Sequence, residues 1–231
     1  MSLETGKKIG IALGSGGAKG AAHLGVLKAF EEQGIRFDCV AGTSIGSIVG
    51  AAYAAGLSAE ETARLVQSVY VRDRTGQIDF WNGLDPRLIA TLVEEKLPYQ
   101  TIESLPVPFR AVACTADTQE KKVFTTGSIG EACAASCAIP PYFRPMRLDR
   151  NYIDGAFVDP VPTDEVGAMG ADFVIGVDLD GDAQAEADFI IRPDLSDFSA
   201  MSLFSLSAMY AIGYRAAHSA MPTILNLLRT L

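Results

Sequence analysis

The most informative stretch of the chain is residues 38–56, DCVAGTSIGSIVGAAYAAG, where a short apolar run leads through a glycine-flanked serine into a small-residue segment. This pattern predicts a strand, a tight turn and a helix. Residues 8–34, KIGIALGSGGAKGAAHLGVLKAFEEQG, follow the same plan with a longer glycine loop, and Gly34 is placed to end the helix. Because strands that alternate with helices usually pair in parallel, these two units predict an α/β fold.

The same alternation continues through the rest of the chain. Ser58 and Glu61 have capping-box spacing ahead of an amphipathic helix. Further helices are predicted at residues 85–97, 128–141 and 163–171, and further strands at residues 109–118, 121–127 and 172–181. Residues 151–162 are expected to be turn-rich, and a lid or insertion is expected around Gly76, Trp81, Asn82 and Gly83.

We therefore predict a three-layer α/β/α fold with helices on both faces of a mostly parallel central sheet. One domain is expected over residues 1–231, with a motif-bearing core at about 8–182 and a helical C-terminal segment at about 198–231. The uncharged gap between Asp197 and Arg215 falls short of the ~20 apolar residues of a membrane-spanning helix. A packed helix, a dimer surface and an interfacial patch are all open for this segment.

The composition narrows the class of partner. A net charge of -9 disfavours nucleic acid and tight electrostatic capture by anionic membranes, since both need clusters of Lys and Arg. The N-terminus lacks the long apolar run of a secretory signal, so a cytoplasmic location is expected. Four cysteines without a CxxC pair, and only two histidines, argue against a zinc cluster and predict buried thiols in a reducing compartment.

No metal site is assigned. Acidic residues at the presumed strand ends and turns lack the spacing of metal ligands, so solvated or capping roles are expected for Asp117, Asp159, Asp178 and Asp180.

Gly42-Thr43-Ser44-Ile45-Gly46 is a GxSxG pentapeptide at the turn from strand to helix. Such a turn holds a serine out of the top of the sheet, and the flanking glycines let neighbouring backbone pass closely. The N-terminus of the following helix favours negative charge that develops at Ser44. A lone GxSxG is more often a turn whose serine only caps the helix, but two further motifs favour a nucleophile.

The loop Gly14-Ser15-Gly16-Gly17-Ala18-Lys19-Gly20 brings backbone N–H groups to the end of the first strand, where they can bind an anion. It fails the dinucleotide pattern because Lys19 occupies the last glycine position, and it fails the P-loop pattern because Ala18 precedes the lysine. Loops after adjacent parallel strands face one another across a crevice. The loop is therefore a candidate oxyanion hole for Ser44.

Asp154-Gly155-Ala156 supplies a carboxylate followed by small residues, although Asp-Gly alone is first of all a turn signal. Ser44 needs a base, and an aspartate can take that role if the hydroxyl lies within hydrogen-bond reach. The residues alone thus indicate acyl transfer through a serine.

Together the three motifs resemble the signature of the patatin-like phospholipases, from about Lys8 to Asp182 and including ASCAIPPYF and DGAFVDPVP. The resemblance implies a Ser-Asp dyad with Ser44 as nucleophile and Asp154 as base. It places the oxyanion hole at Gly16 and Gly17, and the residues that would support the loop and the turn are Lys19, Gly20, Gly42, Gly46 and Gly155. The departures from the family pattern remove no reacting group; they are Ser15, Ala156 and Pro160.

The function that the resemblance implies is lipid acyl hydrolysis through an acyl-enzyme, with no cofactor, by a phospholipase A, a lysophospholipase or a fatty acyl esterase. The substrate would be a phospholipid or another fatty acyl ester, with possible transient contact at a membrane surface. The sequence leaves the oligomeric state open. It also leaves two alternatives: an α/β-hydrolase-like esterase or acyl transferase with a histidine-containing triad, and a lipid-binding regulator of low turnover.

The two histidines bear on that choice. His23 lies on an apolar helical face, which favours a packed residue with a local hydrogen bond over a base. Ser44, Asp154 and His218 follow the chain order of an α/β-hydrolase triad, but His218 lies in an apolar helical stretch beyond the last predicted strand. Lys19 is expected to order the loop or face a headgroup. A dyad without histidine predicts no rate limb near the ~6.5 of an ordinary imidazole.

Overall fold

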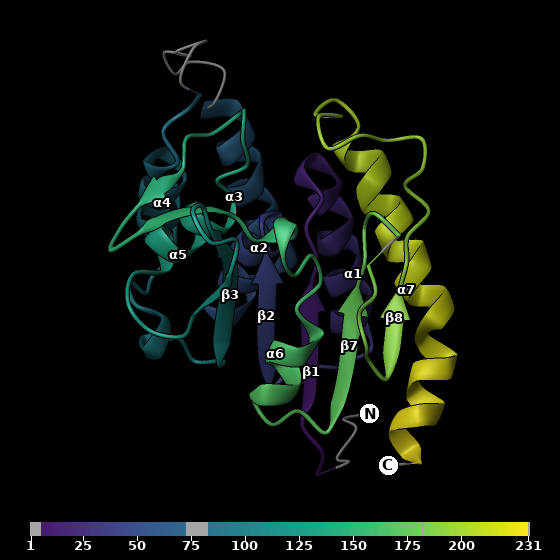
Figure 1. The fold of residues 1–231 in the computed structure, drawn as a ribbon. Coiled ribbons are helices and arrows are strands. Elements are labelled where there is room, and N and C mark those ends of the chain that lie inside the picture. Colours follow the sequence, from purple (N-terminus) through teal and green to yellow (C-terminus); the bar gives the residue numbers. More distant parts are fainter. Residues whose placement is uncertain (1–5, 73–82, 182, 231) are drawn as a thin grey trace.

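The computed structural model describes residues 6–72, 83–181 and 183–230, and this part of the chain is built around one β-sheet (Figure 1). The strand order is β5-β6-β3-β2-β1-β7-β8, with β4 paired to β3. The strands are β1 Ile9–Leu13, β2 Cys39–Thr43, β3 Phe109–Thr115, β4 Lys121–Phe124, β5 Met146–Arg147, β6 Asn151–Asp154, β7 Phe173–Val177 and β8 Phe189–Ile191. β1, β2, β3, β7 and β8 pair in parallel, whereas β4, β5 and β6 pair antiparallel.

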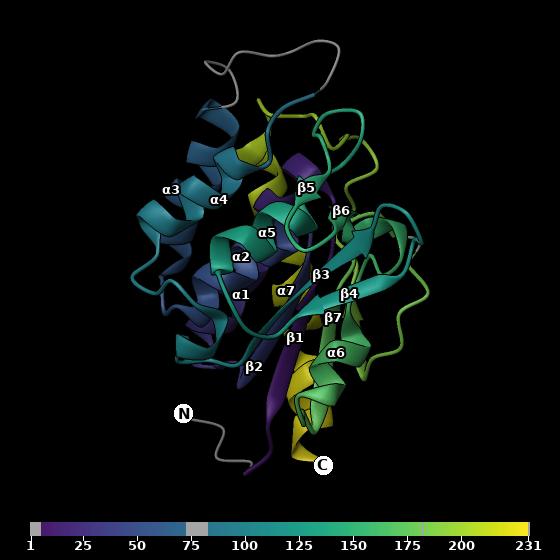
Figure 2. The same cartoon turned by 60° about the vertical axis from the view of Figure 1, so that its left-hand side comes forward.

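Helices cover both faces of the sheet. They are α1 Ala21–Glu32, α2 Ile45–Ala54, α3 Ala59–Arg72, α4 Arg87–Lys96, α5 Ile129–Ser136, α6 Thr163–Ala168 and α7 Leu206–Arg229, with short 3-10 helices η1 Gly17–Gly20, η2 Ile102–Ser104 and η3 Gly155–Phe157. Figure 2 shows α6 on one side of β1 and β2, and α1 and α2 on the other. The predicted three-layer α/β/α fold with a mostly parallel sheet is confirmed.

The two faces of the sheet carry side chains of different size, because successive residues of a strand point to opposite sides. Ile11 and Leu13 of β1 point into the main core, which the long helices complete. Ala12 of β1 and Ala41 of β2 join a smaller cluster with Val166 of α6. The small residues on this face let the short helix α6 pack close to the strands.

The C-terminal segment contains a packed helix. α7 lies along α1, and its side chains Met209 and Ile224 are buried in the main core (Figure 1). At the crossing, a Cβ on Gly213 would collide with the backbone of Ala22, and a Cβ on Gly25 would collide with the backbone of Tyr210. Within the described ranges, no helix is long and apolar enough to cross a membrane.

Two predictions about secondary structure are wrong in detail, and one strand was not predicted. Residues 151–154, expected in turns, form β6, because they pair with the distant β3. β8 follows residue 182 and was not predicted, since three residues carry almost no periodicity. The C-terminal helix begins at Leu206 instead of about residue 198, and before it the hydroxyls of Ser199 and Ser202 hydrogen-bond backbone N–H groups locally, which competes with helix formation.

Other local predictions are confirmed. Ser58 and Glu61 make the reciprocal hydrogen bonds of a capping box. The four cysteines are buried and unpaired. The expected lid cannot be compared with the structure at Gly76, Trp81 and Asn82, which lie outside the described residues.

Gly213→Ala tests the contact between α1 and α7. The added methyl group must displace the backbone of Ala22, so we expect the free energy of unfolding to fall by about 1–3 kcal/mol. Gly167→Ala in α6 is the matched control, because no atom lies within 4 Å of its Cβ position. Helix propensity there predicts a gain of up to ~1 kcal/mol. Urea unfolding followed by circular dichroism measures both, and equal stabilities would contradict the close crossing.

Candidate active site

Ser44 occupies the turn between β2 and α2 with a backbone that is rare for a residue with a side chain. Its φ is 54° and its ψ is -128°. Such a conformation costs about 1–3 kcal/mol and is kept where surrounding structure enforces it. Ser44 stands at the N-cap of α2, but its side chain caps no N–H; instead, Oγ donates to Asp154 Oδ2 at 2.6 Å. The alternative in which this serine only caps the helix is therefore wrong.

The register of three strands brings Ser44 and Asp154 together. Thr43, the last residue of β2, pairs with Val112 of β3. The next residue of β3, Ala113, pairs with Asp154 at the end of β6. Ser44 and Asp154 thus lie on either side of β3 at the same level, although 110 residues separate them in the chain.

Small polar groups hold both residues in place. The Ser44 N–H donates to Ser136 Oγ at 2.8 Å, and Ser136 Oγ in turn donates to the carbonyl of Val112. Ser47 Oγ donates to the Ser44 carbonyl at 2.6 Å. The second carboxylate oxygen of Asp154 accepts the N–H of Ala156 at 2.8 Å. The orientation of the serine and of the carboxylate is therefore set by hydrogen bonds from α2, α5 and η3.

Asp154 is completely buried, and burial raises the pKa of its carboxyl from 3.8 to about 6. The hydrogen bonds from the Ser44 hydroxyl and the Ala156 N–H lower the pKa by less than burial raises it. The carboxylate is a stronger proton acceptor than an exposed aspartate and is still mostly ionised at neutral pH. A rate limb from Asp154 itself would therefore titrate close to that of an imidazole, so the expected absence of a limb near 6.5 stays a prediction about histidine alone.

The glycine loop lies beside this pair. The Gly14 and Ser15 N–H groups donate to the carbonyls of Val177 and Pro160, which anchors the loop to β7 and to the segment after Asp154. Gly16 and Gly17 line the same cavity as Ser44 and Asp154. Gly17 has a φ of 56°, and a Cβ there would lie 2.7 Å from the carbonyl oxygen of Ala200, so a side chain is excluded.

The predicted supporting residues lie where chain segments touch. A Cβ would collide with neighbouring atoms at each of Gly20, Gly42, Gly46 and Gly155. Lys19 was expected either to order the glycine loop or to face a headgroup. In the structure its Nζ forms an ion pair with Asp180 at 2.8 Å, a contact of the loop-ordering kind.

Neither histidine lies at the Ser44–Asp154 pair. His23 Nε2 is 2.8 Å from the Gly14 carbonyl oxygen, and burial lowers the pKa of His23 to about 4. The imidazole is therefore neutral and donates to the carbonyl, as a packed residue with a local hydrogen bond should. His218 is on α7, exposed, and stacks on Tyr214.

The four acidic residues expected to be solvated or to cap turns have structural partners. Asp178 is buried and accepts the N–H groups of Asp180, Gly181 and Ala183. The other three form ion pairs: Asp117 with Arg150, Asp159 with Lys121 and Asp180 with Lys19. Across residues 6–72, 83–181 and 183–230, no group of three His, Cys, Asp or Glu side chains could hold a metal ion.

A cavity of about 600 Å³ adjoins Ser44 and Asp154 and is otherwise mostly apolar. Leu84, Leu88 and Leu92 line it from α4 and the segment before it, and Ile45 and Ile48 line it from α2. A hydroxyl, a buried carboxylate and a pair of glycines thus face an apolar space, an arrangement that can accept an apolar acyl group.

Sequence reasoning missed several of these residues. Ser136 lies within the quoted ASCAIPPYF stretch, but a serine among small helical residues carries no local sign of its contact with Ser44. Leu84, Leu88 and Leu92 recur every four residues, so their shared face could have been predicted from helical periodicity.

Comparisons with known proteins identify a family and a shared fold. A family model described as patatin-like phospholipase matches residues 11–166. An uncharacterized NTE family protein of Mycobacterium tuberculosis is 35% identical over 178 residues, which are 75% of this chain and 49% of that protein. Human patatin-like phospholipase domain-containing protein 6 is 34% identical over 189 residues, 76% of this chain and 14% of that protein.

A solved structure shares the fold. The crystal structure of VipD from Legionella pneumophila superposes with a TM-score of 0.71 over 94% of this chain and 67% of that chain, at 14% sequence identity. The chain spans about half the length of the mycobacterial relatives that it matches, and a smaller share of the animal ones.

Asp154→Asn tests the burial of the carboxylate. A folded pKa about 2 units above the unfolded value means that the ionised group costs up to about 3 kcal/mol of stability above pH 6, and nothing below pH 4, where both states are protonated. We therefore expect the variant to be more stable than the parent at pH 8, with the difference vanishing as the pH falls to 4. Urea unfolding at several pH values measures this.

Asp178→Asn is the matched control, because it replaces another buried aspartate. Its carboxylate accepts several N–H groups and the Arg192 Nε–H, so the substitution should destabilise the protein at pH 8. Destabilisation by Asp154→Asn at pH 8 would contradict the assigned cost of the Asp154 charge.

Proposed function

The chain belongs to the patatin-like phospholipase family, and on that premise we propose that it is a lipid acyl hydrolase with Ser44 as nucleophile and Asp154 as base. The observation that carries the proposal is the 2.6 Å hydrogen bond from the Ser44 hydroxyl to a completely buried carboxylate. A serine hydroxyl is a weak nucleophile until an adjacent base accepts its proton. The raised pKa of Asp154 suits that base to neutral pH.

The reaction proceeds in two steps, acylation of Ser44 and hydrolysis of the acyl-enzyme. Ser44 Oγ attacks the ester carbonyl carbon as its proton passes to Asp154, and collapse of the tetrahedral intermediate expels the alcohol, which takes that proton. Water then attacks the acyl-enzyme, gives a proton to Asp154, and the fatty acid leaves as Ser44 regains its proton. No cofactor takes part in either step.

The oxyanion of each tetrahedral intermediate is bound by the N–H groups of Gly16 and Gly17. Both glycines line the cavity that holds Ser44, and the absence of a side chain at Gly17 lets Ala200 pack directly against the loop. Ser44 also lies at the N-terminus of α2, whose dipole favours the same negative charge. Loss of one such donor typically costs roughly 2.7–4 kcal/mol of transition-state binding.

The substrate is a fatty acyl ester, either a phospholipid, a lysophospholipid or a simpler ester. The mostly apolar cavity beside Ser44 accepts the acyl chain. Around its mouth Ile139, Tyr142 and Met201 are exposed, and Phe204, nearby in the chain, is 89% exposed. Large exposed apolar side chains beside a binding site favour contact with a lipid surface. We propose that this rim makes transient contact with a membrane or micelle.

Two further sequence-based expectations stay predictions. They are a single domain over residues 1–231 and a cytoplasmic location. The relatives matched here are longer than this chain, so the activity and partners of the whole protein are part of the proposal.

Ser44→Ala should abolish the hydrolysis of p-nitrophenyl fatty acyl esters while the unfolding midpoint stays close to that of the parent. A fluorophosphonate probe should label Ser44 in the parent, and labelling should be absent in Ser44→Ala and orders of magnitude slower in Asp154→Asn, because an amide cannot accept the serine proton. Hydrolysis above a tenth of the parent rate in Ser44→Ala would refute the nucleophile.

The pH dependence tests the base. Asp154 must be ionised to act, so kcat/KM should be constant above its pKa and fall about tenfold per pH unit below about pH 6. Because this limb lies near that of a histidine, its position alone does not identify the base. His218→Ala should keep both the plateau and the limb if the dyad is correct. Loss of the limb together with most of kcat in that variant would favour a histidine triad.

A further inference from the structure

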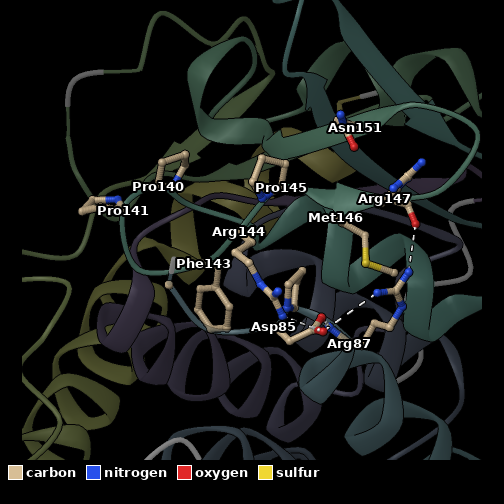
Figure 3. Close-up of a pocket in the computed structure, with 12 residues that line it drawn as sticks. Asp85, Arg87, Pro140, Pro141, Phe143, Arg144, Pro145, Met146, Arg147 and Asn151 are labelled. Atoms are coloured by element: carbon tan, nitrogen blue, oxygen red, sulfur yellow. Dashed lines mark hydrogen bonds and ion pairs between the residues drawn. The ribbon is translucent and has the colours of Figure 1, made fainter. Parts of the chain in front are cut away.

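A second cavity lies next to the catalytic one. It has a volume of about 720 Å³ and is lined from the start of α4 and from the segment that leads into β5 and β6 (Figure 3). Gly83, Pro141 and Phe143 line both cavities, so the two spaces share a wall. The second cavity therefore adjoins the one that Ser44 lines.

The charged lining of this cavity is positive. Among the described residues it consists of Arg87, Arg144, Arg147 and a single carboxylate, Asp85. Figure 3 shows Arg144 and Arg87 reaching Asp85 from opposite sides, with the Arg144 ion pair at 2.9 Å and the Arg87 pair at 3.9 Å. Arg147 has no carboxylate partner in the described part of the chain. One carboxylate cannot neutralise three guanidinium groups, and the excess stands out in a chain whose net charge is -9.

Backbone hydrogen bonds hold the two arginine-bearing segments together. The Leu84 N–H donates to the Tyr142 carbonyl, and the Arg144 N–H donates to the Leu84 carbonyl. Leu84 lines the catalytic cavity and the next residue, Asp85, lines the charged one. Phe143 lines both cavities, and the next residue, Arg144, lines the charged one alone. The apolar and the charged lining are thus fixed relative to each other.

We propose that this arginine cavity, formed by Asp85, Arg87, Arg144 and Arg147, binds the phosphate of an anionic phospholipid whose ester lies at Ser44. The proposal rests on the lipid hydrolase function proposed above and names its substrate class. A guanidinium offers five N–H donors in one plane, a geometry that matches phosphate oxygens. The single carboxylate, Asp85, can accept only some of the N–H donors that the three arginines supply. In a phospholipid the phosphate is a few bonds from the acyl ester, which suits two adjoining cavities that share Gly83, Pro141 and Phe143.

The lining favours an anionic over a zwitterionic headgroup. A choline ammonium is bound by aromatic cages or by free carboxylates. Phe143 is the one aromatic ring among the described lining residues, and the Asp85 carboxylate is engaged by Arg144. An anionic headgroup is attracted by the guanidinium groups. The ammonium of a zwitterionic headgroup would instead be repelled by them, because both are positively charged. The predicted preference is therefore for phosphatidic acid and similar lipids over phosphatidylcholine.

Binding to protein that carries Ser44→Ala tests the proposal without turnover. Calorimetric titrations would use dihexanoyl phosphatidic acid, dihexanoyl phosphatidylcholine and inorganic phosphate, with both lipids kept below the concentrations at which they form micelles. Monomeric lipids remove any contribution from attraction to a charged surface. Arg87→Gln, Arg147→Gln and the double variant are compared with Arg64→Gln, which removes the same charge from an arginine that, like Arg87, has a side chain 61% exposed.

We expect phosphatidic acid to bind more tightly than phosphatidylcholine and than inorganic phosphate. Its affinity should fall about tenfold for each arginine replaced in the cavity, as for the loss of one charge-assisted hydrogen bond. Arg64→Gln should change nothing, and unchanged unfolding midpoints would show that the variants are folded. Arg147→Lys should recover part of the affinity lost in Arg147→Gln, because it restores the charge without the planar donor pair.

Three results would overturn the assignment. They are equal affinity for the two lipids, equal losses in Arg64→Gln and Arg87→Gln, and binding of inorganic phosphate as tight as that of phosphatidic acid, which would indicate a site for the free anion. Absence of lipid binding to Ser44→Ala, together with fluorophosphonate labelling of Ser44 in the parent, would refute the headgroup site and leave the proposed function standing. Absence of that reaction in the parent would instead remove the proposed function.

Discussion

The hydrogen bond from Ser44 Oγ to Asp154 Oδ2 can form only if β2, β3 and β6 keep one particular register. Its two residues come from strands that do not touch, and they meet because β3 keeps register with β2 on one side and with β6 on the other. A slip of one residue in either pairing would turn the side chains of a whole strand to the opposite face. The Ser136 hydroxyl, which bonds both the Ser44 N–H and the Val112 carbonyl, ties the same three points together from α5.

This arrangement works against stability. Ser44 holds a left-handed backbone although it has a side chain, and Asp154 is ionised near neutral pH although its side chain is completely buried. Asp178 shows how a buried carboxylate is stabilised elsewhere in this chain, by several N–H groups and a guanidinium. Asp154 has only the Ser44 hydroxyl and one N–H. The missing partners leave its carboxylate basic, and the burial of the main core has to offset the cost.

Local patterns predicted the parts of the structure that depend on neighbours in the chain. The strand–turn–helix around Ser44 and the Ser58 capping box are of this kind. Contacts between distant segments were not predictable in the same way: β6 exists because it pairs with β3, and the arginine cavity joins Arg87 to Arg144 and Arg147, about 60 positions away. The role proposed for Asp154 rests on a family resemblance, whereas its raised pKa follows from burial, which no motif encodes.

The strand order also affects how the chain can be divided. The family match ends at residue 166, but β7 begins at Phe173 and pairs with β1 from Ile9 to Leu13. A chain shortened at residue 166 would turn β1 from an interior strand into an edge, with a row of unpaired backbone groups beside fully buried apolar side chains, and would remove α7 from α1. Such edges recruit strands from other molecules. The fragment that carries all three motifs would therefore aggregate instead of serving as a minimal hydrolase.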